Sequence, residues 1–335
     1  MESRFGALHF STVLPGKAFQ RISRRLDSEG VEVVYDLEDT HWDPLDERRT
    51  AERREAARLN LQELVRGRVK KTGENYGINF SVRINGIGTN DAQKDVCALA
   101  ELRIPFRSLV LPKVCSASCL LTFLEIAKGY GLRFQEIIPI LESRQALEGV
   151  GELLEELSDS RDSRVRRVMF GAFDYCLDCG IWPFLQQNTF EFWSLVKNLV
   201  GEIERRGFEY VHTPFQRVND SGTFETIVFR LLGICERQFW MSTMTRGQLA
   251  ALTVVAHCVE SGCGDSIRAA REEFADGGID GLALAAEAVH TYESSTRDPR
   301  TGRDHGFVLD VRTGWFISPH EYLAAKRYLD TQWAS

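Results

Sequence analysis

The chain has 335 residues, of which 43% are hydrophobic and 27% charged, and its net charge is -7 at pH 7. This is the composition of a globular protein with a sizeable core. The acidic balance argues against a nucleic-acid-binding protein, because phosphate contacts require clustered Lys and Arg. The longest apolar runs are too short to span a membrane, and the N-terminus has no basic segment followed by a continuous apolar one. We therefore expect a cytoplasmic protein with no membrane or nucleic-acid partner.

The strand and helix patterns alternate along the chain. Short runs rich in β-branched and aromatic residues are separated by longer runs with apolar residues at three- and four-residue spacing. Strands are predicted at 7–14, 31–37, 78–84, 106–113, 136–141, 166–171, 208–213 and 238–243. Helices are predicted between them at 15–28, 46–65, 116–131, 190–207, 223–235 and 246–262.

Eight alternating strand–helix units predict a parallel sheet with crossover helices. Eight is also the number at which such a sheet closes into a (β/α)8 TIM barrel. An open doubly wound sheet is the alternative, but the chain has neither a G-x-G-x-x-G after an early strand nor a P-loop. We expect an α/β fold with the TIM barrel in residues 1–262. Residues 263–335 are expected to form a C-terminal extension of helices and a hairpin. Its helical patterns are followed by a turn-rich stretch at 295–306, the hairpin at 307–318 and a closing helix.

Polar residues follow the predicted strands at the points where the strands end. The active site of a TIM barrel lies at this end of the strands, so these side chains are expected to meet there. A site rich in carboxylates suits Mg²⁺, and an arginine in it can stabilise an oxyanion. The residues are Asp36, Glu38 and Asp39 after the second strand, Arg83 and Asn85 after the third, Lys113 after the fourth, Glu142 after the fifth, Asp174 after the sixth, His212 and Thr213 after the seventh, and Ser242 and Thr243 after the eighth.

Each of these residues also has a purely structural interpretation. Acidic residues after strands often cap the next helix, as Asp39 or Glu142 could. Arg83 could pair with a carboxylate of the second strand, Lys113 could be a solvated loop lysine, and His212 could be a hydrogen-bonded structural histidine. The convergence of all of them on one end of the barrel favours a functional site.

The cysteines are expected to be reduced thiols, as in a cytosolic protein. Cys176 and Cys179 form a lone C-x-x-C, for which a redox role stays open. A zinc site would require a second ligand pair at suitable spacing, which the sequence lacks. We interpret the pair as ordinary, partly buried thiols.

Six motifs occur in order over about residues 10 to 235, namely VLPG, VVYDLEDTHWDP, SVRIN, LVLPKV, IPILES and VMFGAFDYCLDCG. In these motifs the sequence resembles the citrate lyase β-subunit-like branch of the HpcH/HpaI aldolase superfamily, which includes malyl-CoA and citramalyl-CoA lyases. The resemblance implies a TIM barrel that forms a homotrimer or a multiple of one, with a C-terminal segment that can reach a neighbouring subunit's site. It also implies Mg²⁺ as cofactor and a small organic acid or its CoA thioester as substrate.

The resemblance also implies roles for individual residues. The family's metal-binding Glu and Asp fall on Glu142 and Asp174, and its substrate-anchoring Arg falls on Arg83. The predicted site residues are Arg83, Asp39 and Asp36 for catalysis, Arg83, Glu38, Lys113 and His212 for substrate binding, and Glu142 and Asp174 for the metal.

Two departures from the family bear on the activity, and a further difference concerns its aldolase branch alone. The family's Ile-His-Pro motif at the eighth strand is replaced by FWMSTMTRGQL, and its C-terminal catalytic Asp by Ser318, with Asp310 close in sequence. The aldolase branch has a histidine base at about the position of Asp39. We predict a Mg²⁺-dependent carbon–carbon lyase acting on a hydroxy- or oxo-acid. The alternatives are a non-catalytic barrel that binds an organic acid, and a CoA-independent 2-oxo-acid aldolase with His212 as its base.

Overall fold

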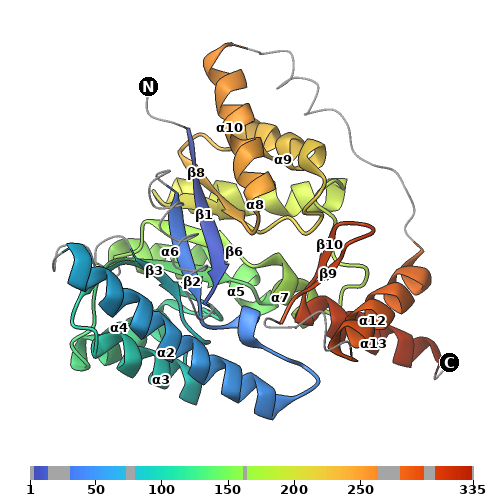
Figure 1. Ribbon diagram of the computed structural model, residues 1–335. Coiled ribbons are helices and arrows are strands. Elements are labelled where there is room, and N and C mark those ends of the chain that lie inside the picture. Colours follow the sequence, from blue (N-terminus) through green and yellow to red (C-terminus); the bar gives the residue numbers. More distant parts are fainter. Residues whose placement is uncertain are drawn as a thin grey trace.

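The computed structural model describes residues 4–13, 31–72, 80–160, 164–262, 280–297 and 306–333. Eight parallel strands close into a barrel in chain order, which confirms the predicted TIM-barrel fold (Figure 1). All eight predicted strands are present. They are β1 (Phe5–Thr12), β2 (Glu32–Asp36), β3 (Ser81–Arg83), β4 (Pro105–Leu111), β5 (Arg133–Leu141), β6 (Arg167–Phe170), β7 (Glu209–His212) and β8 (Phe239–Thr243).

From β2 onward, helices connect the successive strands and pack around the barrel. The helix predicted at 15–28 lies outside the described residues. The others are the short helix η1 (Asp39–His41), α2 (Glu47–Thr72), α3 (Asn90–Ala100), α4 (Ala117–Gly129), α5 (Arg144–Glu148), α6 (Val150–Asp159), α7 (Ala172–Cys179), α8 (Phe190–Arg205), α9 (Ser221–Ile234) and α10 (Arg246–Glu260). No helix among the described residues has the length and apolar character needed to cross a membrane.

The strands are buried on both faces, which explains their continuous apolar runs. All five residues of β2 are buried. Val34 belongs to the apolar cluster inside the barrel, whereas Val33 and Tyr35 belong to the cluster between strands and helices. Because side chains alternate along a strand, Asp36 points to the same side as Val34, at the C-terminal mouth of the barrel. Asp36 pairs in register with Arg83 of β3, which brings the two side chains to one place.

A buried ion cluster around Arg167 fills the other end of the barrel. Its guanidinium donates to Glu32 (Nη1 to Oε2, 2.8 Å) and to Glu136 (Nη2 to Oε2, 2.7 Å), and it lies 4.3 Å from the centre of the Trp240 ring. The Ser108 hydroxyl donates to Glu32 at 2.9 Å. Each buried charge in this cluster has a partner of opposite sign, as a buried polar group requires. The mouth of the barrel is therefore the end where the polar groups have room for a ligand.

The C-terminal extension packs on the barrel of its own chain. The predicted hairpin and closing helix are present, and the closing helix, α13 (Pro319–Trp333), contacts α7 at the barrel mouth (Figure 1). Trp182 Nε1 donates to the carbonyl of Gly281 at 2.9 Å and ties the extension to the loop after α7. The predicted boundary at residue 262 stays a prediction, because 263–279 and most of the turn-rich stretch lie outside the described residues. The elements are α12 (Gly281–Arg297), the antiparallel strands β9 (Val308–Asp310) and β10 (Trp315–Ile317), and α13 (Pro319–Trp333).

Candidate metal and substrate site

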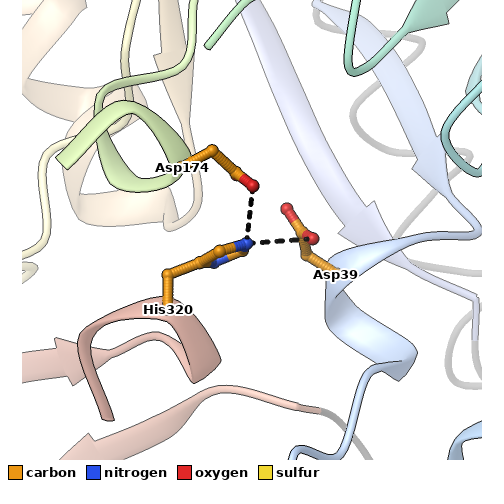
Figure 2. A group of neighbouring side chains, drawn as sticks. All are labelled: Asp39, Asp174 and His320. Carbon is orange, nitrogen blue, oxygen red and sulfur yellow. Dashed lines mark ion pairs between the residues drawn. The ribbon is translucent and has the colours of Figure 1, made fainter. Parts of the chain in front are cut away.

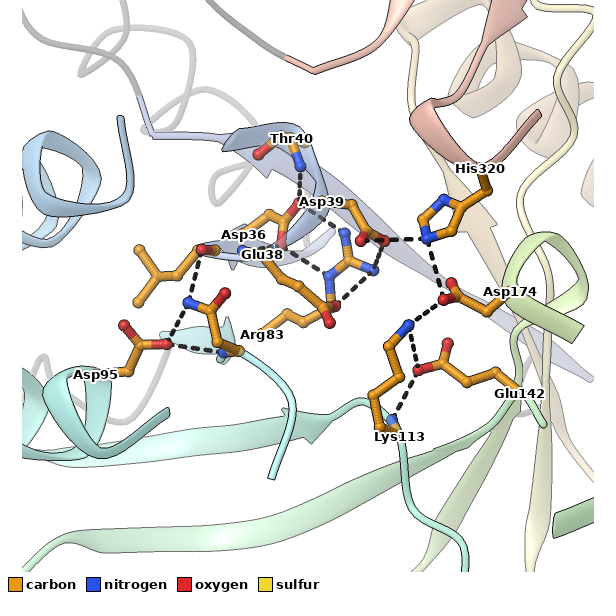
Figure 3. A network of polar contacts seen from close by, with 12 residues as sticks. Asp36, Glu38, Asp39, Thr40, Arg83, Asp95, Lys113, Glu142, Asp174 and His320 are labelled. Atoms are coloured by element: carbon orange, nitrogen blue, oxygen red, sulfur yellow. Dashed lines mark hydrogen bonds and ion pairs between the residues drawn. The ribbon is translucent and has the colours of Figure 1, made fainter. Parts of the chain in front are cut away.

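Arg83 is held by carboxylates at and after the end of β2 (Figure 3). Its Nε and Nη2 donate to the two oxygens of Asp36 at 2.7 and 2.6 Å, and its Nη1 donates to Asp39 Oδ2 at 2.8 Å. Asp36 also accepts from the backbone N–H groups of Glu38 and Thr40, at 3.0 and 3.1 Å. The register of β2 and β3 thus brings three of the predicted site residues together. Three of the five guanidinium N–H groups are used in these bonds.

The carboxyl groups around Arg83 differ in the protonation state that they favour. Burial alone would raise the pKa of Asp36, but the charge and hydrogen bonds of Arg83 outweigh it and bring that pKa to about 2. Burial, followed by the charge of Asp39, raises the pKa of Glu38 well above its usual value. Glu38 Oε2 is buried without a hydrogen-bond partner, 3.5 Å from Arg83 Nη1. One carboxylate is therefore fixed as an anion, whereas its neighbour favours the protonated form.

Lys113 lies between the two predicted metal ligands, Glu142 and Asp174 (Figure 3). Its Nζ contacts Asp174 Oδ1 and lies 3.4 Å from Glu142 Oε1, and its backbone N–H donates to the same Oε1 at 2.7 Å. Gly171 leaves room for this arrangement, because a Cβ there would lie 2.5 Å from Glu142 Oε2. The two carboxylates therefore share one cation, which is the lysine ammonium.

The pKa shifts of Glu142 and Lys113 follow from burial and from the close approach of their charges. Burial, followed by the charge of Asp174, raises the pKa of Glu142 to about 7. Burial would lower the pKa of Lys113, but the charges of Glu142 and Asp174 outweigh it and raise that pKa. Two carboxylates this close favour any cation placed between them.

His320 was not predicted from the sequence and lies at the centre of the site (Figure 2). Its Nε2 lies 3.0 Å from Asp174 Oδ1 and 3.7 Å from Asp39 Oδ1, and its ring meets Trp42 edge to face. Burial would lower the pKa of His320, but Asp174 and Asp39 outweigh it and raise that pKa. Burial would raise the pKa of Asp174, but His320 and then Lys113 outweigh it and lower it. Ligand atoms of Asp39, Asp174 and His320 lie within 4.8 Å of one another, which suits a metal ion.

A capping arrangement at the start of α13 places His320. The backbone N–H of Glu321 donates to Ser318 Oγ at 3.1 Å, and Pro319 occupies the first helical position, where it is well tolerated. Ser318 is fully buried as a helix cap. The sequence S-P-H-E at 318–321 is typical of such a helix start. The C-terminal segment therefore contributes the histidine, and not the serine, to the site.

Asp310, the other candidate for a C-terminal acid, is engaged in its own hairpin. It accepts from the Thr313 hydroxyl at 2.7 Å and from the backbone N–H of Arg312 at 2.9 Å. These bonds close the turn between β9 and β10, and Asp310 does not line the cavity described below.

His212 is fully buried and does not line the cavity. Its Nδ1 is 3.0 Å from the Tyr210 hydroxyl, its Nε2 is 3.0 Å from Gln187 Oε1, and its ring stacks on Trp193. Burial lowers its pKa to about 3. These contacts are those of a neutral structural histidine, so the substrate-binding role predicted for it has no support in its placement.

Cys176 and Cys179 are free thiols in α7. Burial raises the pKa of Cys176 to about 12, so its thiolate is disfavoured at neutral pH. This agrees with the interpretation of the C-x-x-C pair as ordinary thiols.

A cavity of about 310 Å³ opens beside these groups at the barrel mouth. The charged residues that line it are Asp36, Asp39, Arg83, Glu142 and Asp174. The rest of the lining is largely apolar and includes aromatic residues from β1 and from the C-terminal hairpin. The site thus has a charged region next to an apolar one.

No protein-family model and no curated protein matches the chain. Solved structures do match. The chain is similar to RipC from Yersinia pestis, at 20% identity and a TM-score of 0.54 over 75% of this chain and 94% of that one. It is similar to the citrate lyase β subunit of M. tuberculosis complexed with oxaloacetate and magnesium, at 16% identity and a TM-score of 0.53 over 75% and 96%.

A third similar structure includes the C-terminal extension. The malate synthase of Haloferax volcanii, in a ternary complex with pyruvate and acetyl-CoA, has 14% identity and a TM-score of 0.64 over 98% of this chain and 90% of that one. Citrate lyase β is thus among the structural neighbours of the chain, in agreement with the resemblance, and at these identities the likeness establishes the fold.

Proposed function

We propose that this protein is a Mg²⁺-dependent carbon–carbon lyase, acting on a small hydroxy- or oxo-acid or its CoA thioester, or catalysing the reverse condensation. The observation that carries the proposal is the group of Glu142, Asp174 and Arg83, gathered around one cavity, in which Glu142 and Arg83 are buried and Asp174 is partly buried. A fold similar to citrate lyase β and malate synthase supports the same class of reaction.

The residues around Asp174 fit a divalent cation. Lys113 already provides a positive charge between Asp174 and Glu142, and the raised pKa of Glu142 reflects an excess of negative charge. Asp174 would be the common ligand, with Glu142 on one side and Asp39 and His320 on the other. When bound, the cation would polarise the oxygen next to the acid's carboxylate as a Lewis acid. Its binding would release the His320 proton, because only a neutral imidazole is a ligand.

Arg83 has the properties of an oxyanion stabiliser in this proposal. Asp36 and Asp39 fix its guanidinium, so it does not have to reorganise when negative charge develops on the substrate. Two of its N–H groups are left by those bonds. Asp36 is therefore a positioning residue for Arg83, and Asp39 lies between the arginine and His320.

The proposal is tested by titrating the protein with Mg²⁺ in a calorimeter and by assaying cleavage of malyl-CoA, citramalyl-CoA, citryl-CoA and free 2-oxo-acid aldols. The double variant Glu142→Gln, Asp174→Asn is expected to lose metal binding and turnover. The control, Glu148→Gln with Asp159→Asn, removes two exposed acids from helices α5 and α6 and should change neither. Metal binding by the first variant equal to that of the parent would disprove the assignment of these ligands.

Two alternatives remain open to the same assays. A non-catalytic barrel is favoured by Ser318 in place of the family's C-terminal acid, and it predicts acid binding without turnover of any substrate. A CoA-independent aldolase with His212 as base predicts loss of retro-aldol activity in His212→Ala, although His212 does not line the cavity. A homotrimer and a cytoplasmic location stay predictions.

A further inference from the structure

We propose that the acid bound in this cavity carries an apolar chain, of branched aliphatic or aromatic size, and not a second carboxylate. The proposal rests on the proposed function for the head of the ligand, the carboxylate and adjacent oxygen that would bind at the metal ligands and Arg83. It concerns the rest of the ligand, which the remaining wall of the cavity selects.

Much of the cavity lining consists of apolar side chains from several elements, and one of them, Phe10, lies 5.3 Å from the Arg83 guanidinium. Phe10 comes from β1, Ile140 from β5 and Met169 from β6, and Met244 follows β8. Met169 also belongs to the apolar cluster that fills the barrel interior, so this wall is continuous with the core. Apolar walls with a few placed polar groups are typical of small-molecule sites, and a cavity of about 310 Å³ is at the small end of their range of about 300–1,000 Å³.

The C-terminal hairpin completes this wall. Phe307 and Phe316 both line the cavity, and their rings stack with centroids 5.0 Å apart and planes inclined by 9°. The backbone N–H of Phe316 donates to the carbonyl of Gln216, at 3.0 Å, in the loop after β7. The Tyr292 hydroxyl donates to the carbonyl of Gly306 at 2.6 Å, just before Phe307. The hairpin is therefore fixed on two sides, and its aromatic pair is a built part of the cavity.

The cavity has no spare positive charge for a second carboxylate among the described residues. Arg83 is the only Lys or Arg in the described lining, and it is already held by Asp36 and Asp39. His9 also lines the cavity, but its pKa is lowered to about 4, first by burial and then by Arg246, so it is neutral at pH 7. A second carboxylate would be desolvated against apolar walls and without a partner, which is costly.

Pairs of 2-oxo acids that share a chain length test this directly. In Mg²⁺, calorimetric titration would compare 2-oxopentanoate with 2-oxoglutarate, and 2-oxobutyrate with oxaloacetate, with pyruvate, 4-methyl-2-oxopentanoate and phenylpyruvate to extend the series. We expect affinity to rise about fourfold for each added buried methylene. Each dicarboxylate should bind at least about tenfold more weakly than its monocarboxylate partner. Equal or tighter binding of 2-oxoglutarate would overturn the proposal.

A cation placed in the apolar wall should reverse the preference. Met244→Lys is expected to tighten 2-oxoglutarate and weaken 2-oxopentanoate, because the ammonium would pair with the distal carboxylate. Phe316→Ala is a second variant for the case in which the first does not fold, and it should flatten the dependence on chain length. The control Val254→Lys adds the same charge on the exposed face of α10, where Val254 is 51% exposed, and should change neither affinity.

The results that would reject the apolar subsite differ from the results that would reject the proposed function. If the acids bind with Mg²⁺ but show no dependence on the chain, the head of the site is right and the apolar subsite is wrong. If no acid of either series binds with the metal, the metal-dependent acid site itself is wrong, and the subsite is rejected with it.

Discussion

At the scale of single residues, Lys113 does for the carboxylates of Glu142 and Asp174 what a bound cation would do. Its ammonium contacts Asp174 and lies 3.4 Å from Glu142 Oε1. Burial makes both carboxylates costly to ionise, and a neighbouring positive charge offsets that cost. A lysine side chain is flexible and can swing away from such a position. The metal-free site is therefore held together by a group with which a metal must compete.

Removing this ammonium should tighten metal binding. In Lys113→Met, we expect Mg²⁺ affinity to rise by about tenfold, or ~1.4 kcal/mol, because the lysine ammonium no longer competes for the two carboxylates. The metal-free protein should lose stability to urea, because Glu142 and Asp174 then repel each other. Calorimetric titration and urea denaturation measure the two effects. Lys128→Met, at an exposed position of α4, is the control and should change neither. Weaker metal binding in Lys113→Met would show that the lysine supports the metal site and does not compete for it.

At the scale of elements, α13 contributes as much to the site as a barrel strand does. Its first turn supplies His320, which lies 3.0 Å from Asp174 of α7, and the two helices are in contact. The sequence alone predicted α13 but not this role. His320 is distant in sequence from Asp39 and Asp174, and only the path of the extension over the barrel mouth brings them together.

The nitrogen of His320 should change which metals the site prefers. In His320→Asn, we expect Co²⁺ affinity to fall by about tenfold or more and Mg²⁺ affinity to fall less, because imidazole nitrogen favours transition metals over Mg²⁺. Titrations with each metal, and the visible spectrum of bound Co²⁺, measure this. His257→Asn, on the exposed side of α10, is the matched control. An equal loss for both metals would show that His320 orients Asp174 without being a ligand.

At the scale of the whole molecule, the barrel was predictable because strands buried on both faces differ clearly from helices with one apolar face. The pairing of Arg83 with the acids after β2 was foreseen as one interpretation, since adjacent parallel strands end at the same place. The contact of Lys113 with Glu142 and Asp174 was not foreseen, because it depends on a left-handed backbone at Lys113 and on the close approach that Gly171 allows. A left-handed residue and a close contact at a glycine produce no periodic pattern in a sequence.

The change of the unfolding free energy with pH is the sum of contributions from titratable groups throughout the molecule, and some of these contributions have opposite signs. His9, His41 and His212 have lowered pKa values, so the unfolded chain binds more protons than the folded one at mildly acid pH, and stability falls as pH falls. Glu142 and Glu321 have pKa values raised to about 7, first by burial, and act in the opposite direction. A comparison of variants isolates one group from this sum.

His212→Gln isolates the contribution of the most strongly shifted of these histidines. The folded pKa of His212 is about 3 and the unfolded value is about 6.5, so wild-type stability falls relative to the variant as pH falls through 6.5. Between pH 7 and pH 5 the wild type should lose about 2 kcal/mol relative to His212→Gln. Urea denaturation at both pH values measures this difference, with His257→Gln as an exposed control that should show none. A difference that does not change with pH would mean that His212 is protonated as readily in the folded protein as in the unfolded chain.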